Sequence, residues 1–378
     1  MNVAILGKNQ ISQTVAKTIE DGYNPWLERK FNKMPLNVVA YVSGDLNPPF
    51  IDDKAVLCFE QFAALYNKKI IDKIIFPREV YGVPERMILP WLRKLGVKIN
   101  DICITGRLSE EISLTNFIEL YLSARYLPYL EFHVADHCNL NCKACEHYSA
   151  LVKKPHFTNL QKFTRDFQRL HEFIDDIAMI RILGGEPLLN PELNEYIKLS
   201  RRLYPQAKIH IVTNALLLQK MPENFFETLR QCNAAVIISF YPPLESKMPA
   251  IHKFLLEKRV PFSIGPLNKT FTMKQTLNRH EQPTEIFLQC LQATCNNLYD
   301  GKIASCFLPF TTKYFNAYYG KNLPEDGALD LYDPTLTTEK IKAHLITPFE
   351  RCRYCTPPVE VKWSTIKNPS PITDWVHD

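Results

Sequence analysis

Short apolar segments of strand length alternate with amphipathic helical segments along the first 265 residues. Strands that alternate with helices form parallel sheets, because each helix carries the chain back to the edge where the next strand begins. The sequence therefore predicts an α/β protein. The alternation breaks near residue 107 and stops after residue 265, so a chain of 378 residues is expected to hold several domains.

Two groups of these segments predict two sheets. Residues 1–106 favour a Rossmann-like, doubly wound domain of the nucleotide-binding type, followed by a helical connector over 107–127. Residues 128–265 favour a partial parallel barrel, and residues 266–378, dense in Pro, Cys and aromatic residues, favour a small domain with a β-hairpin. The expected barrel strands are Leu130–Ala135, Ala178–Leu183, Lys208–Val212, Ala235–Phe240 and Pro261–Ile264.

The overall charge and hydrophobicity exclude several classes of function. The net charge is only +5, from 45 basic and 40 acidic residues, which does not indicate a nucleic-acid-binding protein. No apolar stretch is long enough for a membrane span, and the N-terminus does not resemble a signal peptide. A cytoplasmic location is therefore expected, and there the eleven cysteines are better interpreted as metal ligands than as disulfides.

Three cysteines directly follow the first expected barrel strand. Cys138, Cys142 and Cys145 are spaced as in the short loops that hold iron–sulfur clusters. Three thiolates on a cluster of four irons leave one iron without a protein ligand, and an open metal position is where a cofactor or substrate binds. The alternative is a structural zinc site with His147 as a fourth ligand, although such sites usually show paired C-x-x-C groups.

The C-x3-C-x2-C loop resembles the signature of the radical SAM superfamily. The resemblance implies a (β/α)6 barrel, a [4Fe–4S] cluster on these cysteines, and reductive cleavage of S-adenosylmethionine to a 5′-deoxyadenosyl radical. The family often has an aromatic residue before the third cysteine, where this chain has Ala144. The segment Gly184-Gly185-Glu186-Pro187 after the second barrel strand is similar to the family's GGE motif, which contacts the amino group of the methionine. The glycines allow close backbone approach, and a carboxylate can accept a bond from an ammonium group.

Weaker similarities concern the ends of the next strands. Thr213 and Asn214 end the third strand and Ser239 the fourth, where family members place polar contacts to the cofactor. The alternative for each is an ordinary turn residue at the end of a strand. Arg181, His210 and Tyr241 are candidate substrate-binding or catalytic residues, with His133 a further one, because each lies on or directly after a predicted barrel strand. An ion-paired or outward-facing side chain is the alternative.

Five further cysteines lie in the tail: Cys290, Cys295, Cys306, Cys352 and Cys355. Asp300-Gly301 is a strong two-residue turn signal. Counting outward from this turn pairs Tyr299 with Lys302 and Cys295 with Cys306, and opposed residues lie close enough to share a metal centre. The last two cysteines form a C-x-x-C pair.

This tail resembles the twitch and SPASM extensions of radical SAM enzymes, which carry auxiliary [4Fe–4S] clusters. The resemblance implies one auxiliary cluster on four of the five cysteines. The spacing in the family favours Cys290 as the first ligand, whereas the hairpin favours Cys295, and the sequence leaves both open. A structural zinc site is the alternative.

The N-terminal domain keeps only Gly7 of a dinucleotide-binding glycine pattern, which argues against a dinucleotide. Its layout resembles the small nucleotide-binding domains of sugar-modifying enzymes, and Asp45 is placed to bind a ribose hydroxyl. A structural or docking domain is the alternative.

The favoured function is a radical SAM enzyme that acts on a small molecule such as a nucleotide-linked sugar, by oxidation, epimerisation or dehydration. It would need a reductant such as flavodoxin or ferredoxin. The alternatives are a peptide maturase and a non-enzymatic iron–sulfur protein for electron transfer or assembly.

Overall fold

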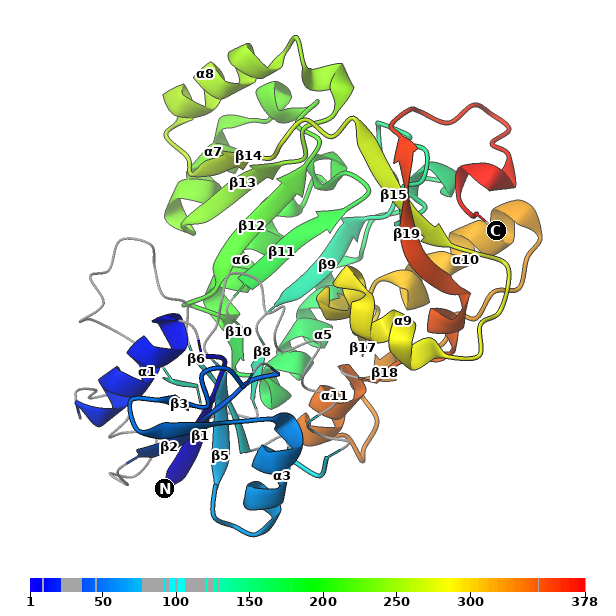
Figure 1. Ribbon diagram of the computed structural model, residues 1–378. Coiled ribbons are helices and arrows are strands. Elements are labelled where there is room, and N and C mark those ends of the chain that lie inside the picture. Colours follow the sequence, from blue (N-terminus) through cyan, green and yellow to red (C-terminus); the bar gives the residue numbers. More distant parts are fainter. Residues whose placement is uncertain are drawn as a thin grey trace. The chain divides into compact units, whose positions relative to one another are not determined.

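The computed structural model describes residues 1–8, 10–21, 36–44, 46–76, 92, 95–98, 101–105, 120–121, 125–127, 129–177, 179–345 and 347–377 (Figure 1). Asp45, most of the helix expected from about Pro84 to Leu95 and most of the connector lie outside these ranges. The chain divides into two compact units, residues 1–126 with 338–346 and residues 127–337 with 347–378. Within the described ranges, no helix has the length and apolar character needed to cross a membrane.

The first unit is built around a mainly parallel sheet with the order β3-β4-β2-β1-β5-β6-β7. β1 pairs in parallel with both β2 and β5, while β3 and β7 pair antiparallel at the two edges. Apolar residues of β1, β2 and α1 form its core. The elements include β1 (Asn2–Leu6), α1 (Gln10–Glu20), β2 (Asn37–Val42), β3 (Phe50–Ile51), β4 (Lys54–Leu57), α3 (Phe59–Asn67), β5 (Lys73–Phe76), β6 (Ile102–Thr105), β7 (Leu120–Tyr121) and α11 (Thr338–Leu345).

The second unit contains a larger sheet with the order β14-β13-β12-β11-β9-β16-β17-β18. The five strands from β14 to β9 are parallel, as the strand–helix alternation predicts. They run side by side in Figure 1, with α7 and α8 beside β13 and β14. Their bounds, with the intervening helices, are β9 (Leu130–Ala135), α5 (Leu160–Phe173), β11 (Met179–Gly184), α6 (Leu193–Leu203), β12 (Lys208–Thr213), α7 (Glu223–Gln231), β13 (Ala234–Ile238), α8 (Met248–Lys258) and β14 (Phe262–Ile264).

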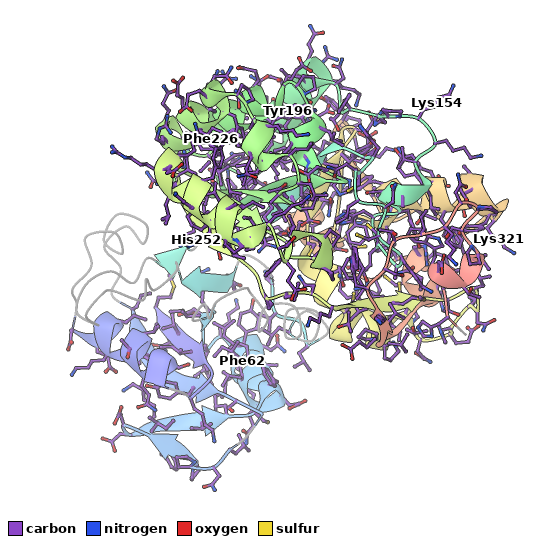
Figure 2. The ribbon with its side chains drawn as sticks, turned by 90° about the horizontal axis from the view of Figure 1, so that it is seen from above. Phe62, Lys154, Tyr196, Phe226, His252 and Lys321 are labelled. Carbon is purple, nitrogen blue, oxygen red and sulfur yellow. The ribbon has the colours of Figure 1, made fainter. Side chains whose placement is uncertain are left out.

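Alternating residues of β9 face two different environments. Phe132 packs on Phe163 of α5 and Tyr196 of α6, with ring centroids 4.4 and 6.3 Å apart. Tyr196 and Phe226, both labelled in Figure 2, are fully buried in this helix-covered side. Because strand residues alternate between faces, Glu131 and His133 point away from these helices. This is why an apolar core and a row of buried polar side chains share one strand.

Strands from the tail extend the same sheet. β16 (Asn297–Tyr299) pairs in parallel with β9 through Asn297 and Glu131, and it pairs antiparallel with β17 (Lys302–Ala304). Residue 265 therefore does not separate two sheets. The remaining elements include β8 (Tyr126–Leu127), β10 (Asp176–Ile177), β15 (Thr270–Gln275), α9 (Pro283–Gln289), α10 (Leu308–Tyr319), β18 (Leu329–Asp330) and β19 (Cys355–Lys362).

The hairpin differs in part from the prediction. Its turn lies at Asp300-Gly301, and Tyr299 pairs with Lys302 as expected. The ladder ends at Asn297 and Ala304, however, so the predicted pairing of Cys295 with Cys306 is wrong. A 3-10 helix over Leu291–Thr294 turns the chain just before Cys295, which prevents the strand from extending that far.

Candidate active site

The predicted cofactor-binding residues meet at one edge of the second sheet. Because β9, β11, β12 and β13 are parallel, their carboxyl ends lie side by side. The cysteine loop follows β9, Gly185 and Glu186 follow β11, Asn214 follows β12 and Ser239 follows β13. This is the edge at which parallel α/β proteins place their ligands.

The two glycines are required by a close approach between the strand ends. A Cβ on Gly184 would lie 2.0 Å from the carbonyl oxygen of Ala135, and one on Gly185 would lie 2.1 Å from that of His137. The backbone N–H of Gly185 donates to Ala135 O at 2.7 Å, and that of Glu186 donates to His137 O at 3.1 Å. The Gly-Gly-Glu segment is therefore bonded to the stretch that leads directly into the cysteine loop.

The side chain of Glu186 is held by hydrogen bonds from its own segment and from the end of the neighbouring strand. Its side chain is fully buried and accepts hydrogen bonds from Thr213 Oγ1 at 2.6 Å and from the backbone N–H of Asn214 at 2.9 Å. A third bond comes from the N–H of Leu188 at 3.1 Å, at the start of the 3-10 helix Pro187–Leu189. Burial raises the pKa of Glu186 to about 7. The carboxylate thus accepts three hydrogen bonds from the chain itself and joins the ends of β11 and β12.

Asn214 connects these strand ends to the cysteine loop. Its Nδ2 donates to Asn139 Oδ1 at 2.7 Å and lies 3.6 Å from the sulfur of Cys138. The backbone N–H of Ser239 donates to Thr213 O at 2.9 Å, so β13 ends beside the same group. The residues chosen from sequence at the ends of three strands are thus adjacent in space.

The three thiols of the loop lie in a largely buried environment. Burial raises the pKa of Cys138 and of Cys142 to about 12, and it also raises the pKa of Cys145. The neighbouring thiols raise the pKa of Cys138 and of Cys142 further, because one thiolate would repel a second, and the Glu146 carboxylate does the same for Cys145. Such thiols are neutral at physiological pH until a metal displaces their protons. These cysteines could hold a cluster.

The C-terminal segment holds this loop in place, which sequence reasoning missed. The N–H of Lys143 donates to Ser364 O at 2.8 Å, and the N–H of Ala144 donates to Asp374 O at 3.0 Å. The N–H of Ile366 donates back to Asn141 O at 3.0 Å. Lys143 also forms an ion pair with Asp374 at 2.8 Å. Backbone bonds between residues more than 200 positions apart leave no pattern in the sequence.

Tyr241 lies beside the same loop, whereas the other substrate candidates lie within the sheet. The Tyr241 ring stacks on Trp363, with centroids 6.3 Å apart, and its pKa is raised by burial and by the nearby thiols of Cys142 and Cys145. Arg181 and His210 occupy opposed positions on β11 and β12. The Arg181 guanidinium lies 5.6 Å from the centroid of the Tyr129 ring.

His133 belongs to a buried polar group directly before the cysteine loop. Its Nδ1 lies 3.6 Å from a carboxylate oxygen of Asp136, which also pairs with His156 at 2.9 Å and accepts a bond from Tyr299 at 2.6 Å. The His133 and His147 rings have centroids 4.7 Å apart, and His147 Nδ1 lies 3.1 Å from Gly184 O. His147 lies two residues after Cys145 in the sequence and therefore contacts the glycine segment from the end of the cysteine loop.

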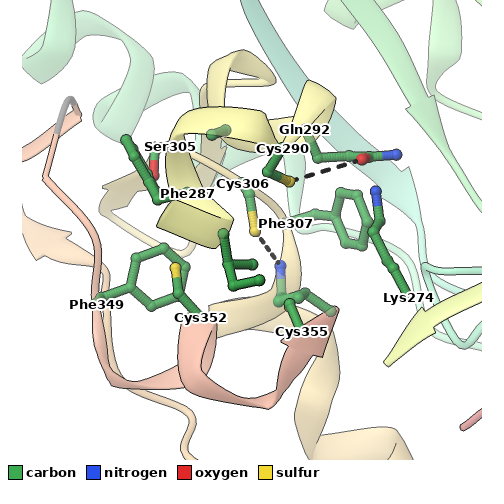
Figure 3. A pocket seen from close by; sticks show the side chains of 13 residues that line it. Lys274, Phe287, Cys290, Gln292, Ser305, Cys306, Phe307, Phe349, Cys352 and Cys355 are labelled. Atoms are coloured by element: carbon green, nitrogen blue, oxygen red, sulfur yellow. Dashed lines mark hydrogen bonds between the residues drawn. The ribbon is translucent and has the colours of Figure 1, made fainter. Parts of the chain in front are cut away.

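Four of the five tail cysteines line a single cavity (Figure 3). Cys290 comes from the end of α9, Cys306 follows β17, and Cys352 and Cys355 lie in and directly after a 3-10 helix over Glu350–Tyr354. Cys295 is not part of the lining. Burial raises the pKa of Cys306, Cys352 and Cys355, and their proximity to one another and to Cys290 raises each further.

Lys274 also lines this cavity and connects it to the first cysteine loop. Its ammonium pairs with Glu146 at 2.9 Å, and Glu146 directly follows Cys145. Gln292, another lining residue, donates to the same carboxylate at 2.5 Å. Among the described residues, no three His, Cys, Asp or Glu side chains converge on a position for one metal ion. In a cubane cluster each thiolate binds a different iron.

Comparison with protein families identifies the region around the first loop. Residues 133–255 match the model of the Radical SAM superfamily. This part of the chain is therefore similar to radical SAM domains. The match begins in β9 and ends in α8, so it contains the cysteine loop and the Gly-Gly-Glu segment. Members of this superfamily use a [4Fe–4S] cluster and S-adenosylmethionine.

The similarity to curated relatives covers only part of the chain. The GTP 3′,8-cyclase of Sulfurimonas denitrificans is 32% identical over 117 residues, which are 30% of this chain and 35% of that protein. The GTP 3′,8-cyclase of Clostridium botulinum strain Hall is 32% identical over 100 residues, 26% of this chain and 31% of that protein. The chain thus spans about a third of the length of these relatives.

Two solved structures are also similar. BtrN in complex with AdoMet and 2-DOIA is 14% identical and has a TM-score of 0.37, over 61% of this chain and 93% of that one. Streptococcus suis SuiB bound to the precursor peptide SuiA is 18% identical and has a TM-score of 0.29, over 37% of this chain and 33% of that one.

Proposed function

We propose that this protein is a radical SAM enzyme that oxidises a small molecule, with a nucleotide-linked sugar as the substrate class. The observation that carries the proposal is the cysteine loop at the carboxyl edge of the sheet, bonded to the Gly-Gly-Glu segment and to Asn214. When bound, the cluster and S-adenosylmethionine would supply a 5′-deoxyadenosyl radical, which abstracts a hydrogen atom from the substrate.

The chain's own residues orient and shield this site. Cys138, Cys142 and Cys145 would hold three irons and leave the fourth for the cofactor. Glu186 fixes the ends of β11 and β12, which leaves the backbone carbonyls of the glycine segment as the acceptors for the cofactor's ammonium group. Tyr241 and Trp363 form an aromatic wall beside the loop, suited to exclude water from a reactive radical.

The tail cavity favours oxidation over epimerisation or dehydration. Four thiols line it, so a [4Fe–4S] cluster there would have a protein ligand on every iron: Cys290, Cys306, Cys352 and Cys355. Such a cluster has no open position for substrate and is suited to accept an electron. A substrate radical that loses one electron to this cluster and one proton to a base becomes a two-electron oxidation product.

The nucleotide-linked substrate rests on the first unit and on the relatives. The sheet order reverses between β1 and β5, and Gly7 directly follows β1 at this point, where doubly wound sheets bind nucleotides. The relatives named GTP 3′,8-cyclase supply a second nucleotide candidate. GTP therefore belongs in any substrate screen, together with nucleotide sugars and a peptide as the competing class.

The test is anaerobic reconstitution with iron and sulfide, followed by an assay of 5′-deoxyadenosine release under reducing conditions. We expect about eight irons per chain, because two clusters of four are proposed. Cys138→Ala should abolish 5′-deoxyadenosine formation, whereas Cys232→Ala, which removes a buried thiol at the end of α7, should not. A well-formed cluster without any cleavage would contradict the enzyme proposal.

A further inference from the structure

Arg351 is a fully buried cation directly before the first cysteine of the C-x-x-C pair. Its guanidinium donates to Gln275 Oε1 at 2.5 Å, to Thr312 Oγ1 at 3.3 Å, to Tyr354 O at 3.3 Å and to Tyr148 Oη at 3.4 Å. All four acceptors are neutral. Across the described part of the chain, no carboxylate forms an ion pair with Arg351.

Neighbouring cations of the same unit are balanced. Lys274, on the wall of the four-cysteine cavity, pairs with Glu146 at 2.9 Å. Arg353, two residues after Arg351, pairs with Glu350 at 2.9 Å and is partly exposed. Arg351 is therefore unusual, because it is buried and has no anionic partner in the described part of the chain. Arg353, two residues later, is paired with a carboxylate.

A buried charge without a counter-charge is strongly unfavourable, because it loses hydration and gains no ion pair in return. The missing anion should therefore be close to Arg351. Gln275, which accepts its shortest hydrogen bond, donates from Nε2 to Cys355 Sγ at 3.6 Å. Cys352 directly follows Arg351 in the sequence. The groups near Arg351 that can become anionic are thus the cysteines of the cavity.

We propose that Arg351 is the counter-charge of the auxiliary cluster and raises its reduction potential. This inference rests on the auxiliary cluster of the proposed function. Four thiolates on a [4Fe–4S]2+ core give a net charge of −2, which becomes −3 on reduction. A buried cation stabilises the more negative state, so Arg351 would make the cluster a better electron acceptor. Lys274 contributes less, because Glu146 already balances it.

The position of Arg351 also links the two cysteine groups. Tyr148, which accepts one of its bonds, donates its own backbone N–H to Cys145 O at 2.8 Å. A chain of hydrogen bonds therefore runs from Cys355 through Gln275, Arg351 and Tyr148 to the first loop. Arg351 is a positioning residue in this scheme, because it acts on the cluster through charge and contacts no reacting atom.

The test measures the potential of the auxiliary cluster alone. Cys138, Cys142 and Cys145 are replaced by Ala in the full chain, which removes the first cluster, and the remaining cluster is titrated by EPR under controlled potential. Arg351→Gln is compared with Arg351→Lys, which keeps the charge. Arg353→Gln is the matched control, because it removes an equal charge two residues away that is already paired.

We expect Arg351→Gln to raise the ratio of oxidised to reduced cluster at a fixed potential at least tenfold, which is 59 mV for one electron. Arg351→Lys and Arg353→Gln should change it far less. If Arg351→Gln alone loses the iron of the auxiliary cluster, while Arg351→Lys and Arg353→Gln retain it, this result would also show that the cluster requires a positive charge at position 351. If Arg351→Gln retains its cluster and that cluster has the same reduction potential as in Arg353→Gln, the inference is overturned. If the chain with Ala at positions 138, 142 and 145 and native Arg351 binds no iron, the auxiliary cluster itself is overturned.

Discussion

Gly184→Ala is expected to disrupt the link between the second barrel strand and the cysteine loop. Gly184 has a φ of +145°, and an added Cβ would lie 2.0 Å from the carbonyl oxygen of Ala135. The obstacle is backbone, which cannot move aside as a flexible side chain could. Relief requires β11 and the segment from Ala135 to His137 to separate, which breaks the bonds made by the N–H groups of Gly185 and Glu186.

The magnitude follows from these losses. The backbone conformation costs about 1–2 kcal/mol for a residue with a Cβ. Two broken hydrogen bonds add about 1 kcal/mol each. The total is therefore about 3–4 kcal/mol. Gly320→Ala is the matched control, because Gly320 also has a positive φ, +61°, but an added Cβ would meet nothing within 4 Å. It should cost only about 1–2 kcal/mol, from the conformation alone.

The assay combines urea unfolding of both variants with hydrogen exchange at the amides of residues 130–145. We expect Gly184→Ala to lower the free energy of unfolding by about 2 kcal/mol more than Gly320→Ala, since two hydrogen bonds separate the variants. It should also speed exchange around the cysteine loop and reduce iron uptake by that loop. Equal destabilisation by the two variants, with unchanged exchange near the loop, would refute the argument from backbone contact.

Three further predictions concern charged groups and thiols. Burial raises the pKa of Glu186 from 4.5 to about 7, so the folded state holds a proton that the unfolded state has lost between these pH values. The free energy of unfolding of the wild type should therefore fall by about 3 kcal/mol as pH rises from 4.5 to 7 and then level off. Glu186→Gln should show no such fall in urea unfolding. Cys290→Ala should lower the iron content below about eight per chain, because one iron of the auxiliary cluster loses its thiolate, whereas Cys295→Ala should leave it at about eight, and the reverse result would assign the ligand to Cys295. Lys143→Met should lower the free energy of unfolding by less than about 1 kcal/mol, because its ion pair with Asp374 is partly exposed, and a larger loss in thermal unfolding would show that this pair holds the loop.

The barrel strands were predictable because each has a strong local signal. The strand expected over Leu130–Ala135 has those bounds in the structure, since apolar residues at alternate positions pack on α5 and α6. Proline favours the start of a helix, and α6 and α7 begin within two residues of Pro191 and Pro222, at Leu193 and Glu223. Strands and helices of this length contain enough residues to show their hydrophobic periodicity in the sequence.

The tail was harder to predict, because its strands are short and its contacts are distant in sequence. β16 has three residues, too few for a periodic pattern, so its place beside β9 in the main sheet was not foreseen. The sequence leaves the choice between Cys290 and Cys295 open, because nothing in it marks Asn297 as the end of the hairpin ladder. Where a ladder ends depends on the packing of the chain around it, here on a 3-10 helix.

The contacts of the C-terminal segment explain why the two cysteine groups belong to one structure. β19 begins at Cys355, on the wall of the four-cysteine cavity, and the residues directly after β19 bond to the backbone around Cys142. β15 pairs along β19 and brings Gln275 opposite Cys355. The same short segment therefore contributes to the second thiol group at one end and supports the first at the other. In the proposed function, the auxiliary cluster accepts an electron from a substrate radical formed at the first loop, and a paired strand fixes the distance between two such sites more rigidly than a loop does.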